Sequence, residues 1–225
     1  MCIRDSPFNN VIEIVESENW FNENRSHCGG VYGAVIGVSD VDVSLAFYRD
    51  VLGYDKVLSD TTGAFEDFVD SSQVSGSYRR AIITHSKERV GPFSKLFGHS
   101  QIELVQAQDR DVKKIFADRM WGDLGYIHLC FDVKGMDQMR EKCKSAGCPF
   151  TVDSGDFDMG EAAGQFAYIE DPDGTLIEFV EAHKIPIMKK FGWYLNMKKR
   201  DPAKSLPRWM LQAMGLNKKN HPVNN

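Results

Sequence analysis

The chain has 225 residues, of which 42% are hydrophobic and 26% charged, a composition typical of a folded globular protein with enough apolar residues for a proper core. No run of about 18 apolar residues occurs, which argues against a membrane-spanning helix. The five cysteines are odd in number and contain no Cys-x-x-Cys pair. This pattern argues against zinc-ribbon and disulfide-scaffold folds and indicates reduced thiols, so we expect a cytoplasmic protein.

The net charge of −5 conceals two parts of opposite sign. Residues 184–225 contain ten Lys or Arg and one acid, whereas residues 1–183 contain 17 basic and 31 acidic residues. An acidic body is a poor partner for nucleic acid, because phosphate neutralisation drives that binding. We predict a basic helical tail over 184–225. Such a helix can lie on an anionic membrane, but we expect it to fold back on the acidic body or against a second pair of modules. Its apolar residues lie at helical spacing: Ile187, Met188, Phe191, Tyr194 and Leu195.

The first thirty residues do not resemble the start of a domain. Residues 1–6 are interpreted as a translated sequencing or assembly artefact and excluded from the fold. The stretch Phe8-Asn-Asn-Val-Ile-Glu-Ile-Val-Glu resembles strands found later in the chain, so residues 7–30 are interpreted as a remnant strand of a preceding module plus a linker. The protein would then be the C-terminal half of a longer four-module chain. The alternative is an edge strand that belongs to this domain.

The next segment predicts a strand, a helix and further strands. Asp40 can cap a helix that Gly53 ends. Between them apolar residues recur at the spacing of one helical face: Val41, Leu45, Tyr48 and Leu52. The expected elements are a strand over 31–38, a helix over 41–52, strands near 54–58, 65–69 and 78–84, a loop over 86–99, a strand over 100–106 and a short connecting helix over Asp109–Met120.

The second half repeats this succession. In the sequence Asp171-Pro-Asp-Gly174, Pro172 presets φ and Gly174 is free to take a positive φ, which predicts a turn. The expected elements are a strand over 126–133, a helix over about 136–146, strands over 149–152 and 165–170, the turn over 171–174 and a strand over 175–181.

The two halves can be superposed as sequences. Gly33–Asp40 matches His128–Gly135, and Gln101-Ile-Glu-Leu-Val matches Leu176-Ile-Glu-Phe-Val. Such self-similarity indicates an internal duplication. We therefore predict an α+β domain over 31–183, built from two βαβββ modules, 31–108 and 124–183. Their curled mixed sheets would form a trough with the helices outside.

Two phrases carry a resemblance to a known family. Gly-Val-Ser-Asp-Val-Asp-Val-Ser-Leu-Ala-Phe-Tyr-Arg-Asp-Val-Leu-Gly (37–53) and Asp-Pro-Asp-Gly-Thr-Leu-Ile-Glu-Phe (171–179) resemble the vicinal oxygen chelate superfamily. It includes glyoxalase I, methylmalonyl-CoA epimerase, extradiol dioxygenases and bleomycin-resistance proteins. The resemblance covers about residues 30–182. It implies that the first and last strands of each module line the trough and that each supplies one metal ligand.

Carried over position by position, the resemblance implies ligands at Gly33, Glu103, His128 and Glu178. Gly33 has no side chain that could bind a metal, so three ligands remain. One imidazole and two carboxylates suit a divalent ion such as Zn, Mn, Ni, Co or Fe(II), and three protein ligands leave positions open for substrate. The metal would chelate two neighbouring oxygens of a small oxygenated metabolite, and Glu103 or Glu178 could act as the base.

This implies a lyase, an isomerase or a dioxygenase, although non-haem Fe(II) oxygenases favour two histidines and one carboxylate. The alternative is a metal-free ligand-binding or sequestering module of the bleomycin-resistance type, because a position that lost its ligand can belong to a protein that lost its metal. The proposed ligands could also be a satisfied core histidine and ordinary strand carboxylates. We expect a homodimer or packing against an absent N-terminal module pair. Four other side chains are weaker candidates for the site: His85 and His99 as replacement ligands, and Gln165 and Tyr168 for orienting substrate.

Overall fold

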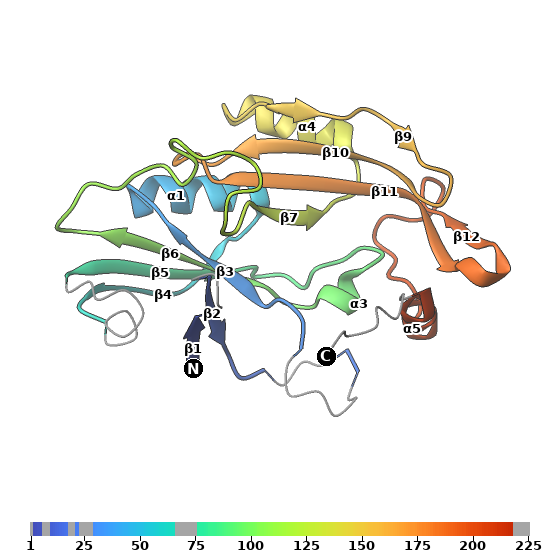
Figure 1. The fold of residues 1–225 in the computed structure, drawn as a ribbon, viewed down its shortest axis with the longest axis horizontal. Coiled ribbons are helices and arrows are strands. Elements are labelled where there is room, and N and C mark those ends of the chain that lie inside the picture. The colour runs from blue at the N-terminus through green and yellow to red at the C-terminus, as the bar shows by residue number, and fades with distance from the viewer. Residues whose placement is uncertain (1, 6–9, 18–20, 23–28, 66–75, 218–225) are drawn as a thin grey trace.

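The computed structural model describes residues 2–5, 10–17, 21–22, 29–65 and 76–217. Most strands form two separate mixed sheets, one of four strands and one of six, and few helices accompany them (Figure 1). The predicted α+β class is confirmed. Within the described ranges, the helices are all too short or too polar to cross a bilayer.

The four-stranded sheet comes from the first half of the chain. Its edge strand β3 is parallel to β6, and the remaining pairs are antiparallel. In sheet order the strands are β3 (Gly33–Gly37), β6 (Gln101–Ala107), β5 (Tyr78–Thr84) and β4 (Lys56–Gly63).

Helix α1 (Val41–Phe47) follows β3 and continues as a π-helical turn, η1 (Tyr48–Leu52). The Asp40 carboxylate accepts the backbone N–H groups of Asp42 and Val43, and Gly53 ends the helix with φ of 78°. The predicted helix over 41–52 and both of its ends are therefore confirmed. A short helix, α3 (Ser94–Phe97), precedes β6.

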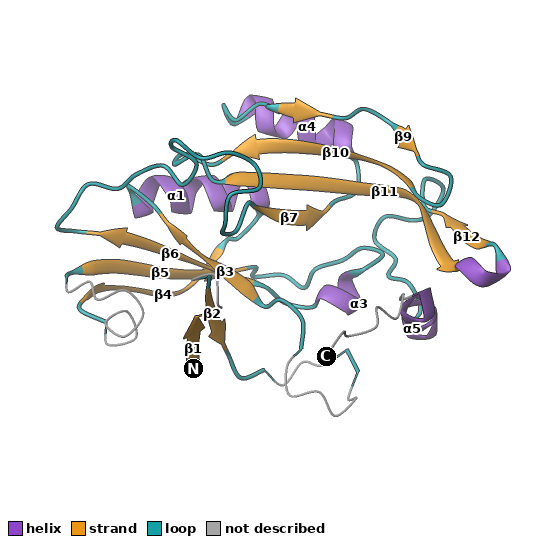
Figure 2. Ribbon diagram, viewed as in Figure 1, coloured by secondary structure: helices purple, strands orange, loops and turns teal. Residues whose placement is uncertain are grey.

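The six-stranded sheet comes from the second half. Strand β7 is parallel to β11, whereas β11 pairs antiparallel with β10 and β12. Helix α4 (Met136–Ser145) follows β7 and covers one face of this sheet (Figure 2). The strands are β7 (His128–Asp132), β8 (Val152–Asp153), β9 (Phe157–Asp158), β10 (Ala163–Glu170), β11 (Leu176–Met188) and β12 (Trp193–Asn196).

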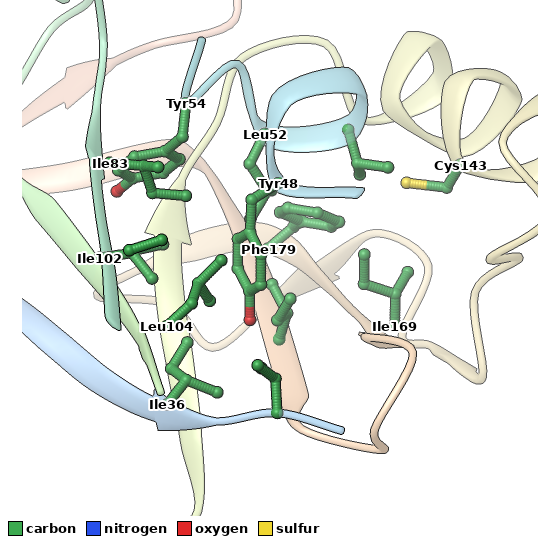
Figure 3. Close-up of a cluster of buried hydrophobic side chains, with 14 of the residues drawn as sticks. Ile36, Tyr48, Leu52, Tyr54, Ile83, Ile102, Leu104, Cys143, Ile169 and Phe179 are labelled. Carbon is green, nitrogen blue, oxygen red and sulfur yellow. The ribbon is translucent and has the colours of Figure 1, made fainter. Parts of the chain in front are cut away.

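One hydrophobic core joins the two sheets. Tyr48 is fully buried near Leu104 of β6 and Phe179 of β11 (Figure 3). Its hydroxyl donates to Asp171 Oδ2 at 2.9 Å. Alternate residues of the central strands enter this core: Ile102 and Leu104 of β6, and Ile177 and Phe179 of β11. Because successive strand residues point to opposite faces, Glu103 and Glu178 lie on the faces turned away from this core.

The predicted helix over Asp109–Met120 is wrong. Residues 109–127 form turns without helix or strand. The apolar side chains of this segment remain exposed, including Val112, Ile115 and Met120. A short helix gains most of its stability from burying an apolar face, and these apolar side chains stay exposed.

The predicted helical tail is also wrong over its first part. Strand β11 continues to Met188, and β12 pairs with it after a short 3-10 turn, η2 (Lys189–Phe191). Ile185 and Ile187 are buried while their neighbours are more exposed, which is the period of two that a strand requires. Helical structure in the described tail is limited to η2, α5 (Arg208–Met214) and η3 (Gly215–Asn217).

Residues excluded as an artefact take part in the structure. Strand β1 (Cys2–Asp5) pairs antiparallel with β2 (Val11–Ile14). The strand interpreted as a remnant therefore finds a partner within this chain. Of the smaller elements, the predicted strand over 149–152 is reduced to β8, and most of the one over 65–69 lies outside the described residues.

Candidate functional site

Three neighbouring strands of the six-stranded sheet bring four polar side chains together. In the ladder, Glu178 of β11 lies opposite Tyr168 of β10 and opposite Cys130 of β7. His128 lies diagonally across from Glu178, with 3.0 Å between His128 Nε2 and Glu178 Oε2. The sequence places this row on one face because Ile177 and Phe179, on either side of Glu178, occupy the core. We call these four side chains the His128 face.

Glu178 lies at the centre of the His128 face. Tyr168 and Cys130 are its direct neighbours on the two adjacent strands. Desolvation, followed by the proximity of Glu178, raises the pKa of Tyr168 and that of Cys130 to about 12. Both groups therefore stay protonated at neutral pH.

His128 has one ring nitrogen engaged and one free. Nδ1 is buried and has no hydrogen-bond partner among the described residues. Nε2, the other ring nitrogen, lies 3.0 Å from Glu178 Oε2. The carboxylate thus orients the ring, and the pair has the form of an acid–base dyad.

Aromatic rings border this dyad. The ring centroid of Trp121 lies 6.1 Å from that of His128 and 5.8 Å from that of Tyr168. The ring centroids of His128 and Tyr168 are 5.4 Å apart. Trp121 is 62% exposed and comes from the turn-rich segment over 109–127. Sequence reasoning missed Trp121, because no periodicity links a loop residue to a strand. Cys130 could have been found, since it lies two residues after His128 on the same strand face.

Glu103 lies in the other sheet and is already paired. Its Oε1 accepts the Arg80 Nε–H at 2.6 Å, and both side chains are close to nine-tenths buried. The Arg80 guanidinium also lies over the ring of Phe65, 4.7 Å from its centroid. The charge of Glu103 is therefore neutralised inside the protein.

Gly33 leaves no room for a fourth ligand. A Cβ added at this position would lie 2.1 Å from the backbone oxygen of Gln101 on the neighbouring strand. No rotation of a side chain relieves a contact with backbone, so strands β3 and β6 would have to separate.

We expect Gly33→Ala to lower the free energy of unfolding by about 1–3 kcal/mol, the usual cost of overpacking. Gly37→Ala is a matched control on the same strand, because a Cβ there meets no atom within 4 Å. Urea denaturation of both variants measures the difference. Equal losses of stability in the two variants would contradict the close approach of β3 and β6.

The described residues do not provide the metal site that the resemblance implies. His128 and Glu178 are brought together, but Glu103 is held by Arg80. No group of three or more His, Cys, Asp or Glu side chains within the described ranges is arranged to hold a metal ion. The donor set present is therefore two residues, one fewer than catalytic sites usually require.

The four weaker candidates named from the sequence do not all lie near the proposed ligands. Tyr168 belongs to the His128 face. His85 packs on the Tyr54 ring, and its Nδ1 lies 2.6 Å from the Gly53 carbonyl oxygen. Gln165 lies opposite Glu181 in the ladder and donates to Asp156, and His99 is exposed. Of these four, Tyr168 alone joins the proposed ligands.

Comparison with known proteins identifies the fold. A sequence model of the Glyoxalase/Bleomycin resistance protein/Dioxygenase superfamily matches residues 26–179. A glyoxalase family protein from Bacillus cereus has a similar structure, with a TM-score of 0.53 and 17% identity over 72% of this chain and 99% of that one. No curated protein matches the chain.

Two further solved structures show weaker structural similarity. A glyoxylase/bleomycin resistance protein/dioxygenase domain from Frankia sp. has a TM-score of 0.47 and 20% identity, covering 69% of this chain and 98% of its own. A fosfomycin resistance protein from Listeria monocytogenes has a TM-score of 0.42 and 13% identity, covering 68% and 93%.

Proposed function

Because the chain belongs to the glyoxalase/bleomycin resistance/dioxygenase superfamily, also known as the vicinal oxygen chelate superfamily, we propose that it binds a small oxygenated molecule on the His128 face without a metal. The pairing of Glu103 with Arg80 is the observation that carries this proposal. Glu103, the third expected ligand, is engaged in this buried ion pair. Binding a metal would leave Arg80 buried without its partner, which is strongly disfavoured.

The His128 face offers a ligand two kinds of contact. The partly exposed side chains of His128 and Glu178 supply polar groups, and the rings of Trp121 and Tyr168 supply flat apolar surface. Small-molecule sites combine apolar surface with a few oriented polar groups in this way. The same dyad can accept or release a proton of the bound molecule.

A thermal-shift screen of small hydroxy, keto and carboxylic compounds, with and without a chelator, tests the proposal. We expect a ligand to raise the melting temperature of the wild-type protein equally in both conditions, because bound ligand stabilises the native state. The effect should be lost in His128→Ala and retained in His99→Ala, a matched change at an exposed histidine.

A second candidate function is a metal-dependent lyase, isomerase or dioxygenase. One observation favours it: His128 Nε2 and Glu178 Oε2, two of the three expected donors, lie 3.0 Å apart. Metal analysis after expression in metal-supplemented medium separates the candidates. Near-stoichiometric metal that disappears in His128→Ala, together with ligand binding that the chelator abolishes, would overturn the metal-free proposal in favour of this one.

A further inference from the structure

The C-terminal segment, which follows the matched residues 26–179, packs in a second, smaller hydrophobic cluster that also includes Phe93. Met197 donates its backbone N–H to the His183 oxygen at 2.8 Å, and Leu206 donates to the Pro92 oxygen at 2.9 Å. These bonds fasten the segment to β11 and to the loop before α3. Its buried cluster comprises Phe93, Ile185, Ile187, Met197, Leu206 and Leu211.

Several cations of this segment are neutralised by the acidic body. Three lysines reach the acids around β9: Lys184 to Asp158 at 3.4 Å, Lys189 to Glu161 at 2.5 Å and Lys198 to Asp156 at 2.8 Å. The fold therefore uses these charges to attach the basic segment to the body.

Arg200 and Lys204 are not used in this way. Neither side chain has a hydrogen-bond or ion-pair partner among the described residues, and Arg200 Nε is buried. A buried N–H that makes no hydrogen bond destabilises the folded state. The cation at Arg200 is thus desolvated on one side without compensation from the protein.

Both cations line one open pocket at the start of α5. Its volume is about 320 Å³, and its walls are Arg200, Asp201, Lys204, Ser205, Pro207 and Met210. This size lies near the lower end of the range for small-molecule sites, about 300–1,000 Å³, which favours a small ligand. Asp201 is the one acid in the wall, and its Oδ1 is occupied by the Ala203 N–H at 2.9 Å, which closes the turn.

We propose that this pocket binds a small organic anion, with its phosphate or carboxylate group facing Arg200 and its apolar part against Pro207 and Met210. A guanidinium offers a fork of N–H donors that matches the oxygens of both groups. Lys204 adds a second positive charge and the Ser205 hydroxyl adds a donor. The pocket is separate from the His128 face, so this inference does not depend on the proposed function.

Titration calorimetry of the full chain with phenyl phosphate and with benzoate tests this inference and distinguishes the two anionic groups. We expect saturable binding of at least one probe, weakened at high salt. Loss of a charge-assisted hydrogen bond predicts about tenfold or greater weakening in Arg200→Gln. Lys204→Gln should weaken binding less, and Arg200→Lys should restore part of it. Lys199→Gln, a change of the same charge at the neighbouring exposed residue, should bind as the wild type does.

Unfolding measurements separate binding from folding. Arg200→Gln should not lower the melting temperature, because its side chain has no partner to lose among the described residues and the unpartnered Nε–H is removed. Absence of saturable binding with both probes would overturn the inference, as would equal affinities in the wild type and Arg200→Gln, or equal weakening in Lys199→Gln. A different outcome is that neither probe binds while the chain sediments with anionic phospholipid vesicles in a manner that depends on Arg200. That result would assign the pocket to a lipid headgroup and overturn the proposal of a free small anion.

Discussion

Replacing Arg80 with methionine is expected to lower the free energy of unfolding by about 3–5 kcal/mol, the usual loss when one partner of a buried ion pair is removed. Methionine retains much of the volume, so the loss comes from leaving the Glu103 carboxylate buried without a counter-charge. Urea denaturation of the purified chain measures it. Addition of divalent metal should not restore the lost stability, since Glu103 is not expected to be a ligand.

Arg79→Met is the matched control. Arg79 precedes Arg80 on β5 and pairs with Asp42 and Asp60, whose side chains are 75% and 32% exposed, compared with 9% for Glu103. Exposed ion pairs contribute about 0–1 kcal/mol, so the same substitution one residue earlier should cost much less. A double variant that replaces both Arg80 and Glu103 with methionine should be more stable than Arg80→Met alone, because no charge is left buried. Equal stabilities of Arg79→Met and Arg80→Met would contradict the buried pair.

The sequence allowed the positions of strands and helices to be predicted better than the side-chain contacts at the site. His128 and Glu178 could be expected to meet, because the first and last strands of a module are parallel neighbours in the resembled fold, and β7 and β11 are paired in this way. The partner of Glu103 could not be expected. Arg80 is 23 residues away on an adjacent strand, and no spacing or composition signal distinguishes it from Arg79.

The tail shows a different limit of sequence reasoning. Ile187, Met188 and Phe191 fit a helical stripe, but Ile185 and Ile187 also fit the alternation of a strand. Pairing of β11 with both β10 and β12 decided between the two patterns. Local sequence cannot show whether a neighbouring strand will be available, so short apolar runs remain ambiguous until the sheet is known.

The Asp171-Pro-Asp-Gly174 turn was predicted from Pro172 and Gly174, but Asp171 makes the long-range contacts. Its carboxylate accepts the backbone N–H groups of Asp173 and Thr175 at 3.0 and 2.7 Å, and the Tyr48 hydroxyl at 2.9 Å. Asp171 is 5% exposed and Tyr48 is fully buried. This one side chain therefore shapes the turn and ties η1 of the first half to the second sheet.

Asp171→Ala is accordingly expected to lower the free energy of unfolding by about 3 kcal/mol or more, because three donors lose their acceptor and those that are buried stay unsatisfied. Tyr48→Phe removes one of these hydrogen bonds and should cost about 1–2 kcal/mol. Asp173→Ala is the control within the same turn, since it loses a single exposed bond from the Ser39 N–H. Urea denaturation of the three variants should rank Asp171→Ala well below the other two. An Asp171→Ala variant as stable as Asp173→Ala would mean that Asp171 does not join the two halves of the fold.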